Sequence, residues 1–156
     1  MRILGVDPGT GILGFGLIDS DNGKLSCLDA GVIRTPPKQP DADRLETIFN
    51  ELSEIINQHK PEVIAVEKLF FSQNVTTAMS VSQARGVVLL LGKQNKLTLF
   101  EYTPQQIKQA VTGHGKATKQ QIQEMVRVIL KLKEIPKPDD AADALACAIT
   151  CSMNMR

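Results

Sequence analysis

Short apolar runs separated by amphipathic stretches dominate the chain, and the first part of this pattern predicts strands. Three runs near the N-terminus are predicted to be β-strands, at residues 2–7, 12–18 and 25–34. Pro8 ends the first run, because proline cannot donate to a sheet and biases Asp7 before it toward an extended conformation. The sequence Asp21-Asn22-Gly23 is a hairpin signal, so the second and third strands should pair antiparallel. Four glycines predict a flexible turn leading into the second strand, namely Gly9, Gly11, Gly14 and Gly16.

A helix and a buried strand follow, and together they predict a crossover. Apolar residues recur at helical spacing over 42–59, with polar residues between them. The apolar run at 63–66 is then a strand that leads directly into Glu67. A strand–helix–strand unit lets its two strands lie parallel and adjacent. Parallel strands end on the same side of a sheet, so Asp7 and Glu67 are predicted to lie together.

The second half of the chain is predicted to be mostly helical. A long apolar-faced helix at 75–94 precedes a strand at 97–102, and helices follow at about 104–111, 118–131 and 140–151. Asp139 stands just before the last of these helices, where it is a natural N-cap. The whole pattern predicts an α/β fold with a five-stranded mixed sheet flanked by helices. Without an internal repeat or a second-domain boundary, residues 1–156 are predicted to form one domain.

Composition adds a cellular setting and a class of partner. The net charge is only +1, yet residues 104–138 hold seven Lys or Arg residues against two Glu residues, a local net charge of +5. Such a segment suits a polyanion held by its backbone, although a solvated helix face explains it equally well. No apolar stretch approaches the roughly 18 residues that span a bilayer, and no signal peptide precedes the first strand. Three cysteines without metal-ligand spacing are typical of a reduced, cytoplasmic protein.

Four carboxylates carry the candidate chemistry, namely Asp7, Glu67, Asp140 and Asp143. Asp140 and Asp143 share one face of the last predicted helix at i and i+3, and Asp139 shares a face with Asp143 at i and i+4. Taken singly, most of these acids have an ordinary explanation as a turn residue or as a favourable charge at a helix N-terminus. Glu67 is harder to explain, because a buried strand should not end in an unpartnered carboxylate. Together they predict a site for Mg²⁺, which prefers oxygen ligands, and an enzyme that acts on phosphate.

The motifs around these acids resemble a known family. VDPGTGILGFG, AVEKLFFSQN, SQARGV and DAADALACAIT occur in this order over residues 1 to about 150. This combination resembles the RuvC-type Holliday junction resolvases. The resemblance implies a ribonuclease H-like fold in which Asp7, Glu67, Asp140 and Asp143 bind two Mg²⁺ ions, with Mn²⁺ as a substitute. It also places Asp140 at the third acid position and leaves Asp139 as the helix cap.

The same resemblance implies a reaction and partners. A two-metal site suits in-line phosphodiester hydrolysis, in which one ion activates water and the other stabilises the leaving 3′ oxygen. The expected enzyme nicks two opposed strands of four-way junction DNA symmetrically, leaving 5′-phosphate and 3′-hydroxyl ends, in homologous recombination and DNA repair. Two equivalent strands to cut favour a homodimer with twofold symmetry. Work with the RuvA–RuvB branch-migration complex is implied as well.

Further residues are assigned to DNA contacts. Lys119 aligns with a lysine of the family near the scissile phosphate, and Lys108 aligns with another basic contact. We expect both to offset phosphate charge rather than transfer protons. Phe70 aligns with an aromatic residue inserted at the junction centre, where an unpaired base can stack on it. The other candidate DNA contacts are Phe71, Gln73, Asn74, Arg85 and Lys116. Packing inside the fold is the alternative for Phe71, and a structural ion pair is the alternative for Arg85.

Two other functions each fit part of the sequence. An actin-like or ribonuclease H-like module that binds nucleotide or RNA would explain the DPGTG loop, but would need neither the LFFSQN loop nor the DAAD helix. A junction-binding protein without catalysis would explain the basic segment, but not four clustered acids. Hydrolysis of ATP without cleavage of junctions would favour the first of these alternatives.

Overall fold

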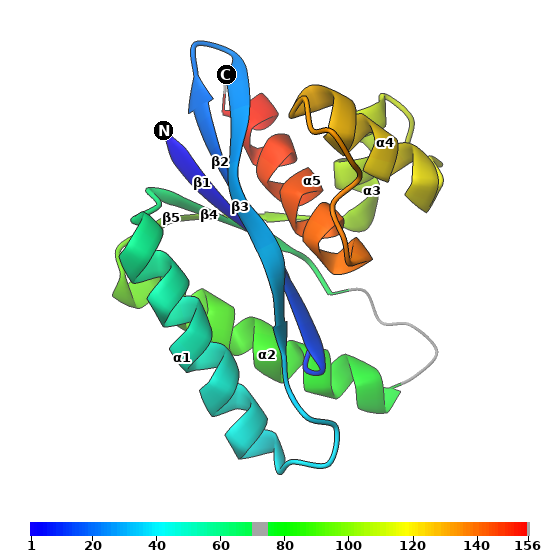
Figure 1. The fold of residues 1–156 in the computed structure, drawn as a ribbon. Coiled ribbons are helices and arrows are strands. Elements are labelled where there is room, and N and C mark those ends of the chain that lie inside the picture. Colours follow the sequence, from blue (N-terminus) through cyan, green and yellow to red (C-terminus); the bar gives the residue numbers. More distant parts are fainter. Residues whose placement is uncertain (70–74, 156) are drawn as a thin grey trace.

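A five-stranded mixed sheet forms the centre of the computed structural model, which describes residues 1–69 and 75–155 (Figure 1). The strands are β1 (Arg2–Asp7), β2 (Ile12–Asp21), β3 (Lys24–Arg34), β4 (Val63–Glu67) and β5 (Thr98–Tyr102). Their order across the sheet is β3-β2-β1-β4-β5. β2 pairs antiparallel with both β1 and β3, whereas β1, β4 and β5 run parallel. The predicted mixed sheet and the predicted crossover from β1 to β4 are both confirmed.

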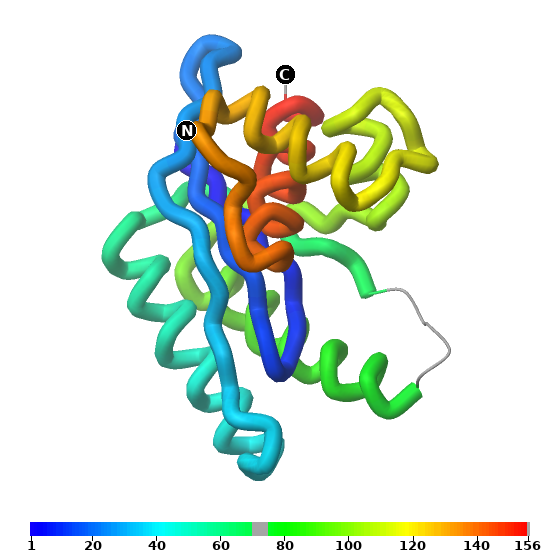
Figure 2. Tube along the Cα trace, turned by 45° about the vertical axis from the view of Figure 1, so that its right-hand side comes forward, coloured from blue at the N-terminus to red at the C-terminus, as the bar shows by residue number. Residues whose placement is uncertain are grey.

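Helices cover both faces of this sheet. In the described part of the chain they are α1 (Asp41–His59), α2 (Val75–Gln94), α3 (Pro104–Thr112), α4 (Lys119–Ile129) and α5 (Asp139–Asn154). α1 and α2 cover one face, whereas α5 covers the other with α3 and α4 packed beside it (Figures 1 and 2). Side chains alternate along β1, so Ile3 joins the core beneath α5 while Leu4 and Val6 join the core beneath α1 and α2.

The hairpin between β2 and β3 has the predicted turn but a longer second strand than expected. Asn22 and Gly23 take positive φ values of 47° and 83°, which a two-residue hairpin turn of the primed type requires. The strands pair up to this turn, with Asp21 opposite Lys24, so β2 extends beyond the predicted end at residue 18. The pairing direction is as predicted, and the extra length comes from backbone hydrogen bonding rather than from apolar patterning.

The predicted cap of the last helix is wrong. α5 begins at Asp139 itself, its N-cap position is Pro138, and no side chain caps it. The Asp139 carboxylate instead lies 3.5 Å from the Lys119 ammonium. α4 does have a side-chain cap, because Thr118 and Gln121 form a reciprocal capping box. Asp139 therefore does not cap the helix and instead forms an ion pair with Lys119.

Small residues let α5 lie unusually close to the sheet. A Cβ atom on Gly5 of β1 would stand 2.0 Å from the carbonyl oxygen of Ala144. One on Gly14 of β2 would stand 2.0 Å from the carbonyl oxygen of Asp140. Gly14 and Gly16 therefore serve as a contact surface within β2 rather than as part of the predicted flexible turn. This close approach carries the first turn of α5 to the strand ends.

Candidate active site

Two of the predicted acids come from neighbouring parallel strands. Asp7 is the last residue of β1 and Glu67 is the last residue of β4, and these strands pair in register. Alternation places Asp7 on the same face as Ile3 and Glu67 on the same face as Val63, and both apolar residues belong to the core beneath α5. The two carboxyl groups share a hydrogen bond. The structure thus brings them together at one end of the sheet, under α5.

The first turn of α5 delivers the other two acids to the same end. Gly14 pairs with Asp7 across the β1–β2 ladder, and the backbone of Asp140 packs directly on Gly14. The negative charges of Asp143 and Asp140 both act on Asp7 and raise its pKa. Four acids therefore converge from two strands and a helix, although they are far apart in the sequence.

Burial and mutual repulsion make this cluster reluctant to ionise. Burial is the main cause that raises the pKa of Asp7 to about 9, and the charge of Glu67 adds to it. Burial also raises the pKa of Glu67, against the opposing effect of its hydrogen bond with Asp7. The pKa of Asp143 is raised too, again mainly by burial, although the charge of Lys119 opposes the rise. The Asp7–Glu67 pair therefore favours keeping a proton at neutral pH, an arrangement that a divalent cation would replace.

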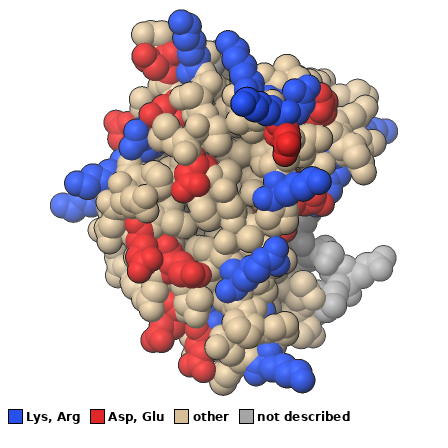
Figure 3. Space-filling view, viewed as in Figure 1, with Lys and Arg blue, Asp and Glu red and all other residues tan. Residues whose placement is uncertain are grey.

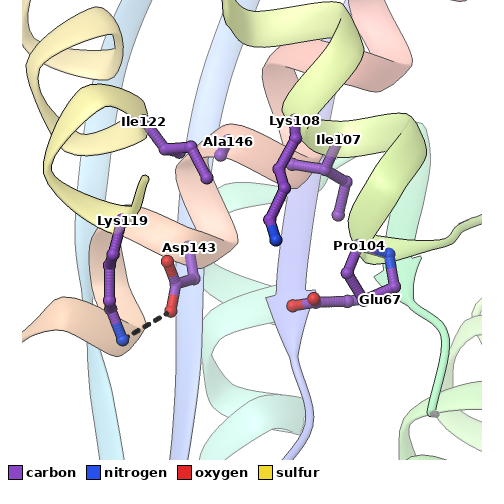
Figure 4. A pocket seen from close by; sticks show the side chains of 8 residues that line it. All are labelled: Glu67, Pro104, Ile107, Lys108, Lys119, Ile122, Asp143 and Ala146. Atoms are coloured by element: carbon purple, nitrogen blue, oxygen red, sulfur yellow. Dashed lines mark ion pairs between the residues drawn. The ribbon is translucent and has the colours of Figure 1, made fainter. Parts of the chain in front are cut away.

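A cleft of about 240 Å³ opens beside the acids, and two lysines line it (Figure 4). Lys119 at the start of α4 lies 3.5 Å from the carboxylate of Asp143. Lys108 on α3 extends toward Glu67 from the opposite wall. The cleft therefore combines the carboxylates of Glu67 and Asp143 with two ammonium groups, which suits an anionic substrate beside a cation site.

Asp139 and Asp140 have different surroundings although they are adjacent in the sequence. The side chain of Asp139 is 60% exposed and pairs with Lys119. The charge of Asp139 acts on Lys119 and Asp143, whereas that of Asp140 acts on Asp143 and Asp7. Of the two, Asp140 is therefore the better placed to bind the same metal ion as Asp7.

The chemistry of these donors fits a hard divalent cation. Within residues 1–69 and 75–155, no group of three or more His, Cys, Asp or Glu side chains is already arranged to enclose a metal ion. The converging donors are nonetheless all carboxylate oxygens, which suit Mg²⁺, Mn²⁺ or Ca²⁺ better than softer metals. Burial raises the pKa values of Asp7 and Glu67, and neighbouring negative charges add to the rise at Asp7, so the ionised cluster requires additional positive charge. A cation would supply that charge.

The other predicted DNA contacts have varied positions. Arg85 forms an ion pair with Glu101 on β5, so the structure favours the structural alternative for this residue. Lys116 is exposed in the α3–α4 loop, and its backbone N–H donates to His114 Nδ1 at 3.0 Å. The predicted contacts Phe70, Phe71, Gln73 and Asn74 lie outside the described residues.

Charge is unevenly distributed over the face shown in Figure 3. Acidic side chains gather at the lower left over α1, whose exposed acids are Asp41, Asp43, Glu46, Glu51 and Glu54. Several Lys and Arg side chains stand along the right-hand half of the same face. An anionic backbone would therefore be repelled by α1 and attracted to the opposite side.

The sequence interpretation missed the glycines that build the site. Gly5 and Gly16 pair across β1 and β2, Gly14 pairs with Asp7, and each glycine touches α5 where a Cβ atom would clash. A signal for this contact was present, because glycine inside a strand often marks close approach of another backbone. The alanines of DAADALACAI supply the matching small surface on α5.

Comparison with known sequences identifies a family. A family model described as crossover junction endodeoxyribonuclease RuvC matches residues 3–151. A relative of that description from Heliobacterium modesticaldum is 56% identical over 155 residues, which cover 99% of this chain and 96% of the relative. One from Fusobacterium nucleatum is 53% identical over 150 residues, which cover 96% of this chain and 79% of the relative.

Solved structures agree with the sequence matches. The structure described as T. thermophilus RuvC in complex with Holliday junction substrate has a TM-score of 0.95 and 38% identity, covering 100% of this chain and 95% of that one. The yeast mitochondrial Holliday junction resolvase Ydc2 has a TM-score of 0.68 at 18% identity, covering 96% of this chain and 78% of that one, which shows a shared fold only. These neighbours confirm the predicted ribonuclease H-like fold.

Proposed function

Because the chain belongs to the RuvC family of crossover junction endodeoxyribonucleases, we propose that the cleft at the ends of β1 and β4 is where it resolves Holliday junctions by endonucleolytic cleavage. The observation that carries this assignment is the convergence of four carboxylates beside a cleft that two lysines share. Core packing does not reward such crowding of like charges, whereas metal-assisted cleavage of a phosphodiester requires it.

The family is one of metal-dependent nucleases, and we infer that Asp7, Glu67, Asp140 and Asp143 hold two Mg²⁺ ions in this chain. Ions held there would supply an attacking water of lowered pKa and stabilise the leaving 3′ oxygen, giving 5′-phosphate and 3′-hydroxyl ends. Asp7 must release its proton first, because carboxylates ligate metals in the ionised form. Asp140 is preferred to Asp139 as the third ligand because its charge acts directly on Asp7.

Lys119 is proposed to offset charge on the scissile phosphate rather than to transfer protons. Partial burial works to lower the pKa of Lys119, but the charges of Asp143 and Asp139 outweigh it and raise that pKa. The ammonium group therefore stays protonated at neutral pH and cannot act as a base. Lys108 is proposed to act in the same way from the opposite wall of the cleft.

Recognition of the junction is proposed to involve the segment between β4 and α2 and the loop before α4. Phe70 follows Glu67 by three residues, so an aromatic ring that stacks on an unpaired base would stand close to the cutting site. Phe71, Gln73 and Asn74 belong to the same segment and complete this proposed contact. Exposed Lys116 is proposed to bind a backbone phosphate.

A homodimer is proposed to form through α2. Val75, Met79 and Leu90 are 65%, 62% and 52% exposed on this helix. By length and composition α2 could cross a membrane, as many core helices of soluble proteins could, yet only 28% of its most apolar window is buried. A second copy would cover this apolar surface and supply the second cutting site. Association with RuvA–RuvB and a cytoplasmic location complete the proposal.

Cleavage of an end-labelled four-way junction tests this function. We expect wild type with Mg²⁺ to nick two opposed strands symmetrically, and EDTA to stop the reaction. Asp7→Asn and Glu67→Gln should bind the junction without cutting it. Glu51→Gln is the matched control, because Glu51 is an exposed acid on α1, and it should cut like wild type. Retained cutting by Asp7→Asn, or ATP hydrolysis in place of cutting, would overturn the assignment.

A further inference from the structure

A chain of hydrogen-bonded side chains crosses the turn that follows Asp7. Arg44 Nε on α1 donates to the hydroxyl oxygen of Thr35 at 2.9 Å. The Thr35 hydroxyl donates in turn to the carbonyl oxygen of Thr10, and the hydroxyl groups of Thr10 and Ser80 are hydrogen-bonded to each other. The β1–β2 turn is thereby tied to α1, to the end of β3 and to α2.

This chain is buried and leaves the turn little freedom. Thr10 is 7% exposed and Thr35 is 4% exposed. Thr35 also donates its backbone N–H to the carbonyl oxygen of Gly11 at 3.0 Å, so one residue holds two consecutive carbonyls of the turn. The Arg44 guanidinium covers Gly11 so closely that a Cβ atom there would stand 3.2 Å from Nη2. Loss of the Thr35 hydroxyl would leave the Thr10 carbonyl and Arg44 Nε without these partners, and buried polar groups are rarely left so.

The turn bears directly on Asp7 because few residues separate them. Pro8 follows Asp7 and has no N–H with which to anchor the chain. Gly9 is so tightly turned that a Cβ atom on it would stand 2.1 Å from the carbonyl oxygen of Ile12. Thr10 lies three residues after Asp7, and both its hydroxyl group and its carbonyl oxygen are hydrogen-bonded. A displacement of Thr10 would rotate the end of β1 and with it the Asp7 carboxylate.

Metal sites depend on such supports. A ligand must be held within about 0.5 Å and 10–20° of its working geometry, and this is usually done by residues that touch neither the metal nor the substrate. Asp7 needs such support because it is the last residue of β1, next to the turn. The Ser80 end of the chain adds a second restraint, from the helix that begins after the proposed junction-binding segment.

We propose that Thr35 is the positioning residue for the Asp7 carboxylate, with Arg44 and Ser80 as its supports. The proposal rests on the proposed function, in which Asp7 is a metal ligand. Thr35 acts through the backbone of the turn and touches neither DNA nor metal. Outer supports of metal ligands typically change metal affinity or activity by about 10- to 100-fold when removed.

The experiment compares Thr35→Val, which keeps the shape and loses the hydroxyl, with Thr35→Ser, which keeps the hydroxyl. Thr150→Val is the matched control, because Thr150 is also buried and its hydroxyl also donates to a carbonyl, that of Ala146, at 2.8 Å. Four quantities are measured: Mn²⁺ affinity of the protein without DNA by electron paramagnetic resonance, kcat, KM and the melting temperature.

We expect Thr35→Val to weaken Mn²⁺ binding and lower kcat by about tenfold each while KM changes less than about twofold. Thr35→Ser should restore both, and Thr150→Val should change neither. Ser80→Ala, at a less buried position, should lower both by about threefold, with rescue by Ser80→Thr, and it provides the test if Thr35→Val does not fold. A lower melting temperature with unchanged Mn²⁺ affinity and kcat would overturn the positioning role. Normal cutting by Asp7→Asn would instead overturn the proposed function, which separates the two failures.

Discussion

The two faces of the sheet are packed in opposite ways. Beneath α1 and α2, large side chains such as Leu4, Leu52 and Ile64 fill the layer and are fully buried. Beneath α5, glycines of β1 and β2 meet the helix directly, so helix and strand backbones almost touch. Both faces bury apolar side chains, but only the second also allows polar groups at the helix start to reach the strand ends.

The core beneath α1 and α2 contributes to stability, whereas the carboxylates beneath α5 provide the proposed chemistry. The face under α1 and α2 gains about 25 cal/mol for each square ångström of apolar surface that it removes from water. At the α5 end of the other face, the fold accepts buried carboxylates with raised pKa values, which stabilise nothing by themselves. Proteins keep such conflicts at functional sites and offset them elsewhere in the core.

The largest effect is expected from enlarging the close contact. Gly5→Ala would drive a Cβ atom into the Ala144 carbonyl, so we expect the free energy of unfolding to fall by about 3 kcal/mol and cutting to be lost. Leu52→Ala on the opposite face should cost about 2–5 kcal/mol in stability, yet the folded fraction should keep its kcat. Urea unfolding combined with junction cleavage checks both.

Gly86→Ala is the control for the glycine substitution. Gly86 lies in α2 with nothing within 4 Å of its added Cβ atom, so helix propensity should raise the stability of the single chain by about 0.5–1 kcal/mol. Because Gly86 shares the side of α2 that the proposed dimer covers, only the stability of this variant serves as the control. If Gly5→Ala were as stable as Gly86→Ala and still cut junctions, the close approach of α5 would not be what builds the site.

Neighbouring acids at the start of α5 should behave very differently. Asp140→Asn should lower kcat by about 10²- to 10³-fold, because loss of a ligand removes several kcal/mol of transition-state stabilisation. Asp139→Asn should lower kcat only about two- to threefold, since it loses a half-exposed ion pair with Lys119. Single-turnover cleavage of a saturating junction measures both. Equal losses would mean that Asp139 also ligates the metal.

Lys119→Met should lower nicking more than it lowers binding. Removal of one half-exposed ammonium beside Asp143 is expected to cost about tenfold in kcat, less than loss of a buried stabilising group. The junction Kd, measured in Ca²⁺ to prevent cutting, should change less than about threefold. Unchanged turnover would remove Lys119 from the reaction.

The acid cluster also predicts how stability depends on pH. Because the pKa of Asp7 is raised from 3.8 to about 9, the folded protein holds a proton that the unfolded chain has released over this range. The contribution is therefore complete below about pH 4 and is lost as the pH rises through about 9. Metal-free protein should be less stable at pH 9 than at pH 6 by at least about 1.4 kcal/mol, the value of a single pKa unit.

Two comparisons test whether Asp7 causes this loss of stability between pH 6 and pH 9. Asp7→Asn should reduce the dependence of stability on pH, since the amide does not titrate in this range. Mg²⁺ should stabilise wild type more at pH 9 than at pH 6, because the ion binds the ionised carboxylates. If Asp7→Asn left the pH dependence of stability unchanged, that dependence would come from other groups.

Much of the fold and half of the site could be predicted from the sequence. Local sequence signals were sufficient to predict single elements, as in the helical spacing of α1 and the hairpin at Asn22-Gly23. The crossover rule then joined Asp7 to Glu67 without knowledge of side chains. These are properties of single elements or of neighbours in chain order.

The remaining features depend on contacts that spacing does not encode. Asp139 and Asp140 share a helix start, and only the packing of α5 on Gly14 distinguishes their surroundings. The hydrogen bond between Thr10 and Ser80 joins residues 70 apart, and each hydroxyl alone suits an ordinary turn or helix position. Such pairs become visible only once the layers are assembled.

Anomalous diffraction from crystals soaked in Mn²⁺ is the most direct test of the central claim that close packing of α5 builds a metal site from four carboxylates. We expect peaks between the ends of β1 and β4 and the first turn of α5, about 2 Å from oxygens of Asp7, Glu67, Asp140 and Asp143. No peak in that region at saturating Mn²⁺, or a peak held by Asp139 without Asp7, would contradict it.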